Sequence, residues 1–225
     1  MKELKDQVKE FWNKAYGDNT PVAFDKKYLV PSNIFDKDIE EFSKNSNYIL
    51  DYGCGITFNL YIAYETNKNL VEALGIDPSS NAINFAEGSA RLSHFDSVHY
   101  LVGDIDELKK LASNKYDFVI CSNVLDCIDE SSRNEAINEL YRVLNKNGFL
   151  LMKVNFFLDK KTAEKYKLTP INEHDYAQDG LFRISFYEDD YWINLFTNLG
   201  LTLYRKDLFS RREGLPSDRI FIFKK

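Results

Sequence analysis

Short apolar runs alternate with segments of helical periodicity between residues 48 and 155, and this alternation restricts the possible folds more than any other feature of the chain. The apolar runs predict strands at residues 48–51, 70–77, 97–103, 116–122 and 149–155. The helical segments between them cover residues 58–66, 80–93, 105–112 and 132–145. Repeated strand–helix alternation of this kind predicts a parallel sheet with helices on both faces.

The flanking segments extend this prediction. An apolar stripe predicts a helix over residues 4–16, and a second short helix is expected near residues 37–44. A polar stretch at residues 156–182 interrupts the alternation and is expected to be an insertion or a lid. The last helix and two strands, which should pair antiparallel, are expected at residues 188–199, 201–207 and 219–223. We therefore expect one α/β domain, a Rossmann-like three-layer sandwich with a seven-stranded, mostly parallel sheet and an antiparallel last strand.

Two of the expected helices carry capping signals at their starts. Ser132 and Glu135 are three residues apart and predict a capping box at the start of the helix over 132–145. Thr57 is expected to cap the helix that follows it.

The composition narrows the functional classes. The 225 residues include 29 Lys and Arg against 35 Asp and Glu, and this net charge of −6 counts against non-specific nucleic-acid binding. The three cysteines, Cys54, Cys121 and Cys127, form no CxxC pair, so neither disulfides nor a metal site is expected. The N-terminus lacks a signal-peptide pattern and no apolar run reaches the length of a membrane span. We therefore expect a cytoplasmic protein that has no membrane partner.

A glycine turn follows the first predicted strand, in the stretch Ile49–Gly55. Gly53 and Gly55 permit a tight turn and a close approach of ligand to backbone, while Asp51 before them suits a cationic group such as an ammonium or sulfonium. A dinucleotide fold would place a third glycine where Phe58 stands, so that alternative is disfavoured. A purely structural strand–helix turn without a ligand is the remaining alternative.

Two further carboxylates end the next two predicted strands. Asp77 lies where a ribose-binding acid belongs, and Asp104 lies where a carboxylate or its adjacent backbone meets an adenine, with Ile105 against the ring. A single acid at a strand end is often a helix cap. Acids at three successive strand ends indicate a ligand site along that edge of the sheet.

The sequence resembles the class I S-adenosylmethionine-dependent methyltransferases. The resemblance rests on the stretches ILDYGCG (49–55), GIDPSS (75–80), GDI (103–105), YDFVICSNVL (116–125) and LYRVLNKNGFLL (140–151). It implies binding of S-adenosylmethionine and release of S-adenosylhomocysteine. The cofactor residues that it implies are Asp51, Gly53, Cys54, Gly55, Ile76, Asp77, Pro78, Asp104, Ile105, Ser122, Asn123 and Leu125, with Tyr16 from the N-terminal helix as part of a cover.

The resemblance also assigns parts of the chain to parts of the reaction. The implied division is an N-terminal helical cap (1–47), a cofactor-binding core (48–155), an acceptor-side insertion (156–182) and a C-terminal helix with a β-hairpin (183–225).

Cys54 has no basic partner nearby in the sequence, so its thiol is expected to pack rather than react.

Methyl transfer from a sulfonium is an in-line displacement that requires alignment and exclusion of water. It needs no covalent enzyme nucleophile, and a general base matters only when the acceptor must lose a proton. His174 is a candidate base with Asp175 to orient it, and Arg183 is a candidate for binding an acceptor carboxylate or phosphate. Solvated polar loop residues are the plainer interpretation of all three.

Four functions remain open at this stage. The expected acceptor is a small molecule. A nucleic-acid acceptor is disfavoured because Asn123-Val124-Leu125-Asp126 replaces the Asn-Pro-Pro-aromatic motif of amino-methylating relatives, and because the chain is acidic. A non-catalytic protein that binds S-adenosylmethionine is the third possibility, and a nucleotide-dependent oxidoreductase is the fourth.

Overall fold

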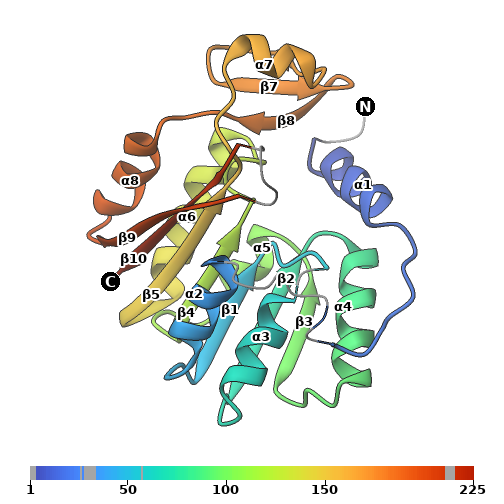
Figure 1. Cartoon of the computed structure of the whole chain (residues 1–225), viewed down its shortest axis with the longest axis vertical. Coiled ribbons are helices and arrows are strands. Elements are labelled where there is room, and N and C mark those ends of the chain that lie inside the picture. Colours follow the sequence, from blue (N-terminus) through green and yellow to red (C-terminus); the bar gives the residue numbers. More distant parts are fainter. Residues whose placement is uncertain (1–3, 26, 28–33, 57, 211–215) are drawn as a thin grey trace.

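A seven-stranded sheet forms the centre of the computed structural model, which describes residues 4–25, 27, 34–56, 58–210 and 216–225 (Figure 1). Its strand order is β3-β2-β1-β4-β5-β10-β9. Only β10 runs antiparallel to its two neighbours, so the fold prediction of a mostly parallel sheet with an antiparallel last strand is confirmed. The bounds are β1 (Tyr48–Tyr52), β2 (Glu72–Asp77), β3 (Val98–Val102), β4 (Tyr116–Ser122), β5 (Leu144–Val154), β9 (Thr202–Phe209) and β10 (Asp218–Lys224).

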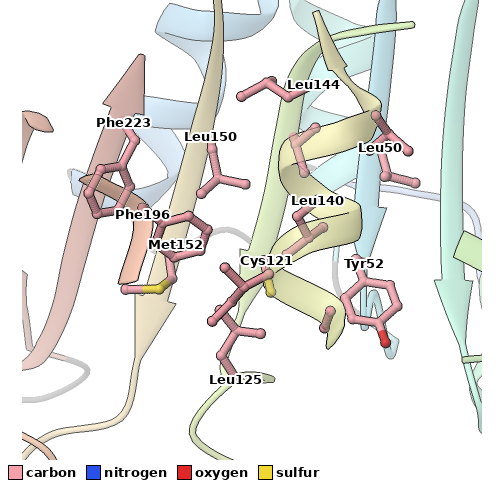
Figure 2. Close-up of a cluster of buried hydrophobic side chains, with 14 of the residues drawn as sticks. Leu50, Tyr52, Cys121, Leu125, Leu140, Leu144, Leu150, Met152, Phe196 and Phe223 are labelled. Carbon is pink, nitrogen blue, oxygen red and sulfur yellow. The ribbon is translucent and has the colours of Figure 1, made fainter. Parts of the chain in front are cut away.

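Successive residues of each central strand face opposite sides of the sheet, and both sides are apolar. On β1, Leu50 belongs to one buried cluster and Ile49 to the other. The same alternation separates Met152 from Leu151 on β5. Figure 2 shows the first cluster, in which strand residues pack against Leu140 and Phe196 from two covering helices. Burial on both faces explains why these strands read as continuous apolar runs.

Helices cover both faces of the sheet. The first cluster contains side chains of α5 (Ile105–Lys110), α6 (Glu130–Val143) and α8 (Asp189–Thr197). The second contains side chains of α2 (Ile34–Ser43), α3 (Asn59–Thr66) and α4 (Ser80–Leu92). Together the three layers make the predicted sandwich. No helix in the described ranges combines the length and apolar character needed to cross a bilayer.

The N-terminal helix α1 (Leu4–Tyr16) lies against the start of α4 rather than on a face of the sheet (Figure 1). The Ser79 hydroxyl donates to Asn13 Oδ1 at 2.8 Å, and Asn81 Nδ2 donates to the Asn13 carbonyl at 3.1 Å. Gly17 ends the helix with φ +60°. These contacts fix α1 at the end of the sheet where β1 and β2 finish.

The insertion is a small folded unit with its own core. It contains α7 (Lys160–Lys165) and an antiparallel sheet of β6 (Thr169–Pro170), β7 (Asp175–Gln178) and β8 (Leu181–Ser185). Its buried residues include Tyr176, Ile184 and Phe186. The sequence prediction assigned no secondary structure here and ended the insertion at residue 182, because runs this short carry no clear period. In Figure 1 the unit lies beyond one end of the main sheet, on the side where α1 lies.

Two local predictions differ from the structure. Helix α6 begins at Glu130, and its cap is Asp129, whose Oδ1 accepts from the Ser132 amide at 3.1 Å. The proposed Ser132–Glu135 capping box is therefore wrong, because an acid three residues earlier already binds that amide. Thr57, the other predicted cap, lies outside the described residues.

Candidate functional site

The turn after β1 is tied directly to the end of β2. The amides of Gly53 and Cys54 both donate to the Ile76 carbonyl, at 2.8 and 3.1 Å. Gly53 has φ +73°, and a Cβ on it would lie 2.1 Å from Val124 Cγ2. Gly55 has φ +52°, and a Cβ there would lie 2.5 Å from the Tyr16 hydroxyl. Both glycines are thus required by the backbone conformation and by contacts with the segments on either side.

Asp77 holds the same turn from the end of β2. Its Oδ2 accepts from the Gly55 amide at 2.8 Å and its Oδ1 from the Ser79 amide at 2.9 Å. Burial raises the pKa of this carboxyl, and the two amide hydrogen bonds oppose that shift. A carboxylate offers about four lone-pair positions, so Asp77 still has capacity to accept two hydroxyls from a ligand.

Asp51 and Cys54 lie beneath the turn. Asp51 is 1% exposed, and its Oδ2 accepts from Asn59 Nδ2 at 3.0 Å. Cys54 is 2% exposed, and burial raises the pKa of its thiol well above the usual range. Their side chains support the turn from below.

Two adjoining cavities open above the turn. The smaller, of about 120 Å³, lies at the β3 side of the sheet, and we call it the β3-side cavity. It is lined by Val8, Lys9, Tyr52, Gly53, Pro78, Asp104, Ile105, Val124, Ile128, Asp129, Ser132 and Phe182. The larger, of about 460 Å³, extends to β5, and we call it the β5-side cavity. It is lined by Val8, Trp12, Tyr16, Gly53, Asp77, Pro78, Ser122, Asn123, Val124, Cys127, Ile128, Lys153, Asn155 and Arg183. Shared lining residues make them one continuous cleft.

Helix α1 supplies an aromatic wall of the β5-side cavity. Trp12 and Tyr16 stack with ring centroids 5.6 Å apart. Burial and the nearby Asp77 carboxylate raise the pKa of the Tyr16 hydroxyl above its usual range, so that hydroxyl stays neutral. The wall therefore combines apolar ring faces with one neutral polar group beside Gly55.

The opposite wall is a hydrogen-bonded network at the ends of β4 and β5. Asn123 has φ +57°, and its Nδ2 donates to Asn155 Oδ1 at 2.9 Å. The amide and Nδ2 of Asn155 donate to Asp126 Oδ2 at 2.7 and 2.8 Å. Asp126 is buried, which raises the pKa of its carboxyl. The network holds the backbone of the loop after β4 against the end of β5.

One acceptor in this network is unused within the described part of the chain. Asn123 Oδ1 is buried and has no hydrogen-bond partner there, although its residue lines the cavity. A buried carbonyl oxygen without a donor is costly. It therefore fits a ligand that brings an N–H or O–H donor, as the ammonium of the predicted cofactor does.

Most of the predicted cofactor residues meet in the cleft. The side chains or backbone that line it include Tyr16, Gly53, Asp77, Pro78, Asp104, Ile105, Ser122 and Asn123. Ile76 and Leu125 are instead buried in the core under the cleft, and Val124 and Ile128 form the apolar lining there. Asp104 also caps α5, since its Oδ1 accepts from the Asp106 amide at 3.0 Å.

The three candidate catalytic residues do not lie together in the structure. Arg183 lines the β5-side cavity. His174 Nδ1 lies 3.2 Å from the Phe186 carbonyl, and its ring packs on Tyr187. Asp175 accepts from the Ser185 hydroxyl and from Asn172 Nδ2. His174 and Asp175 thus bind within the insertion and its edge, and neither lines the two cavities.

Several lining residues were missed by the sequence prediction. Lys153 and Asn155 follow a long apolar run at the end of β5, which is the signal that identified Asp77 and Asp104. Val8 belongs to the α1 stripe, and Cys127 and Ile128 come from the loop between β4 and α6. Nothing in the sequence distinguishes these three from core residues.

Comparisons with known proteins identify the family and support the fold of this chain. Residues 43–176 match a protein family described as "Methyltransferase domain". A bovine tRNA N(3)-cytidine methyltransferase is 27% identical over 68% of this chain and 41% of its own. A carboxy-S-adenosyl-L-methionine synthase of Campylobacter concisus is 25% identical over 67% of this chain and 62% of its own. The chain thus covers less than two thirds of either relative.

A solved structure with a similar fold spans the whole chain. The magnesium protoporphyrin IX methyltransferase of Synechocystis with bound S-adenosylmethionine superposes with a TM-score of 0.63. It is 17% identical, and the match covers 100% of this chain and 98% of that one.

Proposed function

The chain belongs to the class I S-adenosylmethionine-dependent methyltransferases, and from this membership we propose that it transfers the methyl group to a small-molecule acceptor. The observation that carries the choice of acceptor is the β5-side cavity of about 460 Å³. This volume is in the range of small-ligand pockets, and because Asp77 and Asn123 line the same cavity it would also hold part of the cofactor, which leaves space for a small acceptor. The lining comes from α1, the loop after β4 and β8 of the insertion as well as from the strand ends.

The residues of the cleft fit the cofactor in separate places. Asp77 would accept the ribose hydroxyls, since its carboxylate has lone pairs beyond the two amide bonds that it already receives. Pro78, Asp104 and Ile105 would hold the adenine in the β3-side cavity. Asn123 Oδ1 would accept a hydrogen bond from the ammonium.

When bound, S-adenosylmethionine supplies a methyl group on a positively charged sulfur, and its transfer leaves S-adenosylhomocysteine. The protein's contribution is to align the acceptor and exclude water. Trp12, Val124 and Ile128 present apolar surface in the β5-side cavity for that exclusion. No general base is assigned, because neither His174 nor Asp175 lines the cavities and a nucleophilic acceptor requires none.

A nucleic-acid acceptor is the second candidate, and the bovine tRNA methyltransferase among the relatives favours it. The net charge of −6 opposes it, because RNA binding gains most of its free energy from cationic contacts with phosphates. The small-molecule acceptor therefore remains the proposal.

The test separates cofactor from acceptor. Isothermal calorimetry should show binding of S-adenosylmethionine and no binding of NAD, and the reverse result would refute the family-based assignment of the cleft. Release of S-adenosylhomocysteine should then be measured with fractionated small metabolites and with total tRNA. Turnover with a metabolite fraction supports the proposal, turnover with tRNA alone selects the second candidate, and binding without turnover indicates a non-catalytic binding protein.

A further inference from the structure

Arg183 is a cation of the β5-side cavity for which the described residues provide no paired carboxylate. It lies on β8, is half-buried, and lines the β5-side cavity. Its Nη1 donates to Cys127 Sγ at 3.8 Å, and its guanidinium lies over the rings of Phe11 and Trp12, 5.4 and 5.2 Å from their centroids. Stacking on rings leaves the edge donors of a guanidinium available to a planar anion.

Lys153, the second cation of this cavity, and Arg219 differ in this respect. Lys153 Nζ lies 3.6 Å from Asp218 Oδ2, and Arg219 Nη1 lies 3.2 Å from Asp189 Oδ1. Within the described part of the chain, Arg183 forms no such ion pair. Asp77 is the acidic residue among those lining the same cavity, and it already accepts from two backbone amides.

An uncompensated guanidinium in this position has an electrostatic consequence that rests on the proposed function. The cofactor would bring a further positive charge, the sulfonium, into the cavity that Arg183 lines. The guanidinium and the sulfonium would repel each other, and an anion between them would replace this repulsion with attraction to both. We propose that the methyl acceptor carries an anionic group, a carboxylate or a phosphate, that pairs with Arg183.

The place of Arg183 favours the acceptor over the cofactor's own carboxylate as the source of that anion. The guanidinium also borders a small hollow lined by Val8, Phe11, Trp12, Cys127, Gln178, Leu181 and Phe182. None of these described residues comes from the glycine turn or from the ends of β2 and β3. Arg183 therefore borders the insertion side of the cleft in addition to the cavity that it shares with Asp77 and Pro78.

The experiment uses the full chain loaded with S-adenosylhomocysteine, whose own titration shows separately whether the cofactor site exists. Calorimetry at fixed ionic strength compares benzoate and phenyl phosphate with benzamide, a neutral molecule of similar shape that suits the same aromatic wall. We expect at least one anion to bind at least about tenfold more tightly than benzamide, since hydrogen bonds to a charged group exceed neutral ones by this much. Benzoate and phenyl phosphate distinguish a carboxylate from a phosphate.

Three variants identify the residue. Arg183→Gln should weaken anion binding about tenfold or more, Arg183→Lys should retain part of it, and the exposed control Arg91→Gln should leave it unchanged. Affinity for S-adenosylhomocysteine should be the same in all three. Equal binding of benzamide and the anions, or no binding of any, overturns the proposal. So does a loss of cofactor affinity in Arg183→Gln with anion binding intact, which would assign the guanidinium to the cofactor's carboxylate. If S-adenosylhomocysteine itself does not bind, it is the proposed function that fails.

Discussion

The two cavities of the cleft are built in different ways. The β3-side cavity is bordered by strand ends whose positions depend on backbone hydrogen bonds, such as those from Gly53 and Cys54 to Ile76. The β5-side cavity depends on side chains from α1, the loop after β4, β5 and the insertion. The turn that borders the β3-side cavity tolerates few residue types. Substitution of a single side chain would be enough to change the chemistry of the β5-side cavity. Because Asp77, Asn123 and Arg183 all line the β5-side cavity, that cavity combines residues proposed for the cofactor with the residue proposed for the acceptor.

The largest effect should come from Gly53→Ala, which tests whether the turn depends on backbone space. The added Cβ would lie 2.1 Å from Val124 Cγ2 at φ +73°. We expect a loss of about 3 kcal/mol in the free energy of unfolding, from overpacking and the left-handed conformation together. Urea unfolding measures this loss, and calorimetry should show a parallel loss of S-adenosylmethionine binding.

Gly180→Ala is the matched control for that variant. Gly180 has φ +80°, and nothing lies within 4 Å of an added Cβ. Only the conformational strain applies, so about 1 kcal/mol should be lost and cofactor affinity should be retained. Equal losses in the two variants would show that space at the turn is unimportant, and Gly53→Ala with Val124→Ala should recover part of the difference.

An intermediate effect concerns the titration of Asp77, whose pKa is raised by burial above its ordinary value of 3.8. Because the folded state holds this proton more tightly than the unfolded state, the stability contribution is fully present below pH 3.8 and is lost as the pH rises through the raised pKa. Cofactor affinity should change in the opposite direction over the same window, since only the ionised carboxyl accepts ribose hydroxyls without presenting a proton of its own.

Melting temperature and the Kd of S-adenosylhomocysteine, measured between about pH 4 and pH 7, report the two trends. The Asp77→Asn variant has no carboxyl to titrate at this position, so the part of both pH dependences that is due to Asp77 should disappear. The variant should bind S-adenosylhomocysteine about tenfold more weakly at neutral pH. Unchanged affinity in this variant would remove the ribose assignment.

The smallest effect is expected from substitution of His174, which tests whether the insertion contributes a catalytic residue or only lines the cleft. His174→Gln should change kcat/KM by less than about twofold, because the ring packs on Tyr187 and does not line the cleft. A fall of about a hundredfold in kcat with KM preserved would instead identify it as the general base. Steady-state kinetics with the acceptor found by S-adenosylhomocysteine release decides between them.

The same contrast explains what the sequence could predict. Apolar runs predicted the central strands, because a strand that is buried on both faces is apolar at most of its positions. Asp77 and Asp104 were predictable as lining residues because Asp77 ends β2 and Asp104 follows β3 closely, at the edge of the sheet that borders the cleft. Gly53 and Gly55 were predictable because few other residues adopt their conformation.

The β5-side wall was only partly predictable, for a physical reason. Asp126 and Asn155 are 29 positions apart and meet only through the β4–β5 register. His174 and Asp175 remain candidates on the sequence alone, and their contacts with Phe186 and Ser185 could not be predicted from their adjacency. Sequence spacing carries no information about contacts that the fold brings together from distant segments.

The position of β10 has a consequence for how the molecule is assembled. It lies between β5 and β9 in the sheet, yet it follows both in the chain. During synthesis on the ribosome, the outer edge of β5 therefore keeps its backbone donors and acceptors unpaired until the β9–β10 hairpin has emerged. Unpaired edges recruit other chains. Co-translational folding should thus proceed from the cofactor half outward, and the interval before the hairpin arrives is when this protein is most prone to aggregate.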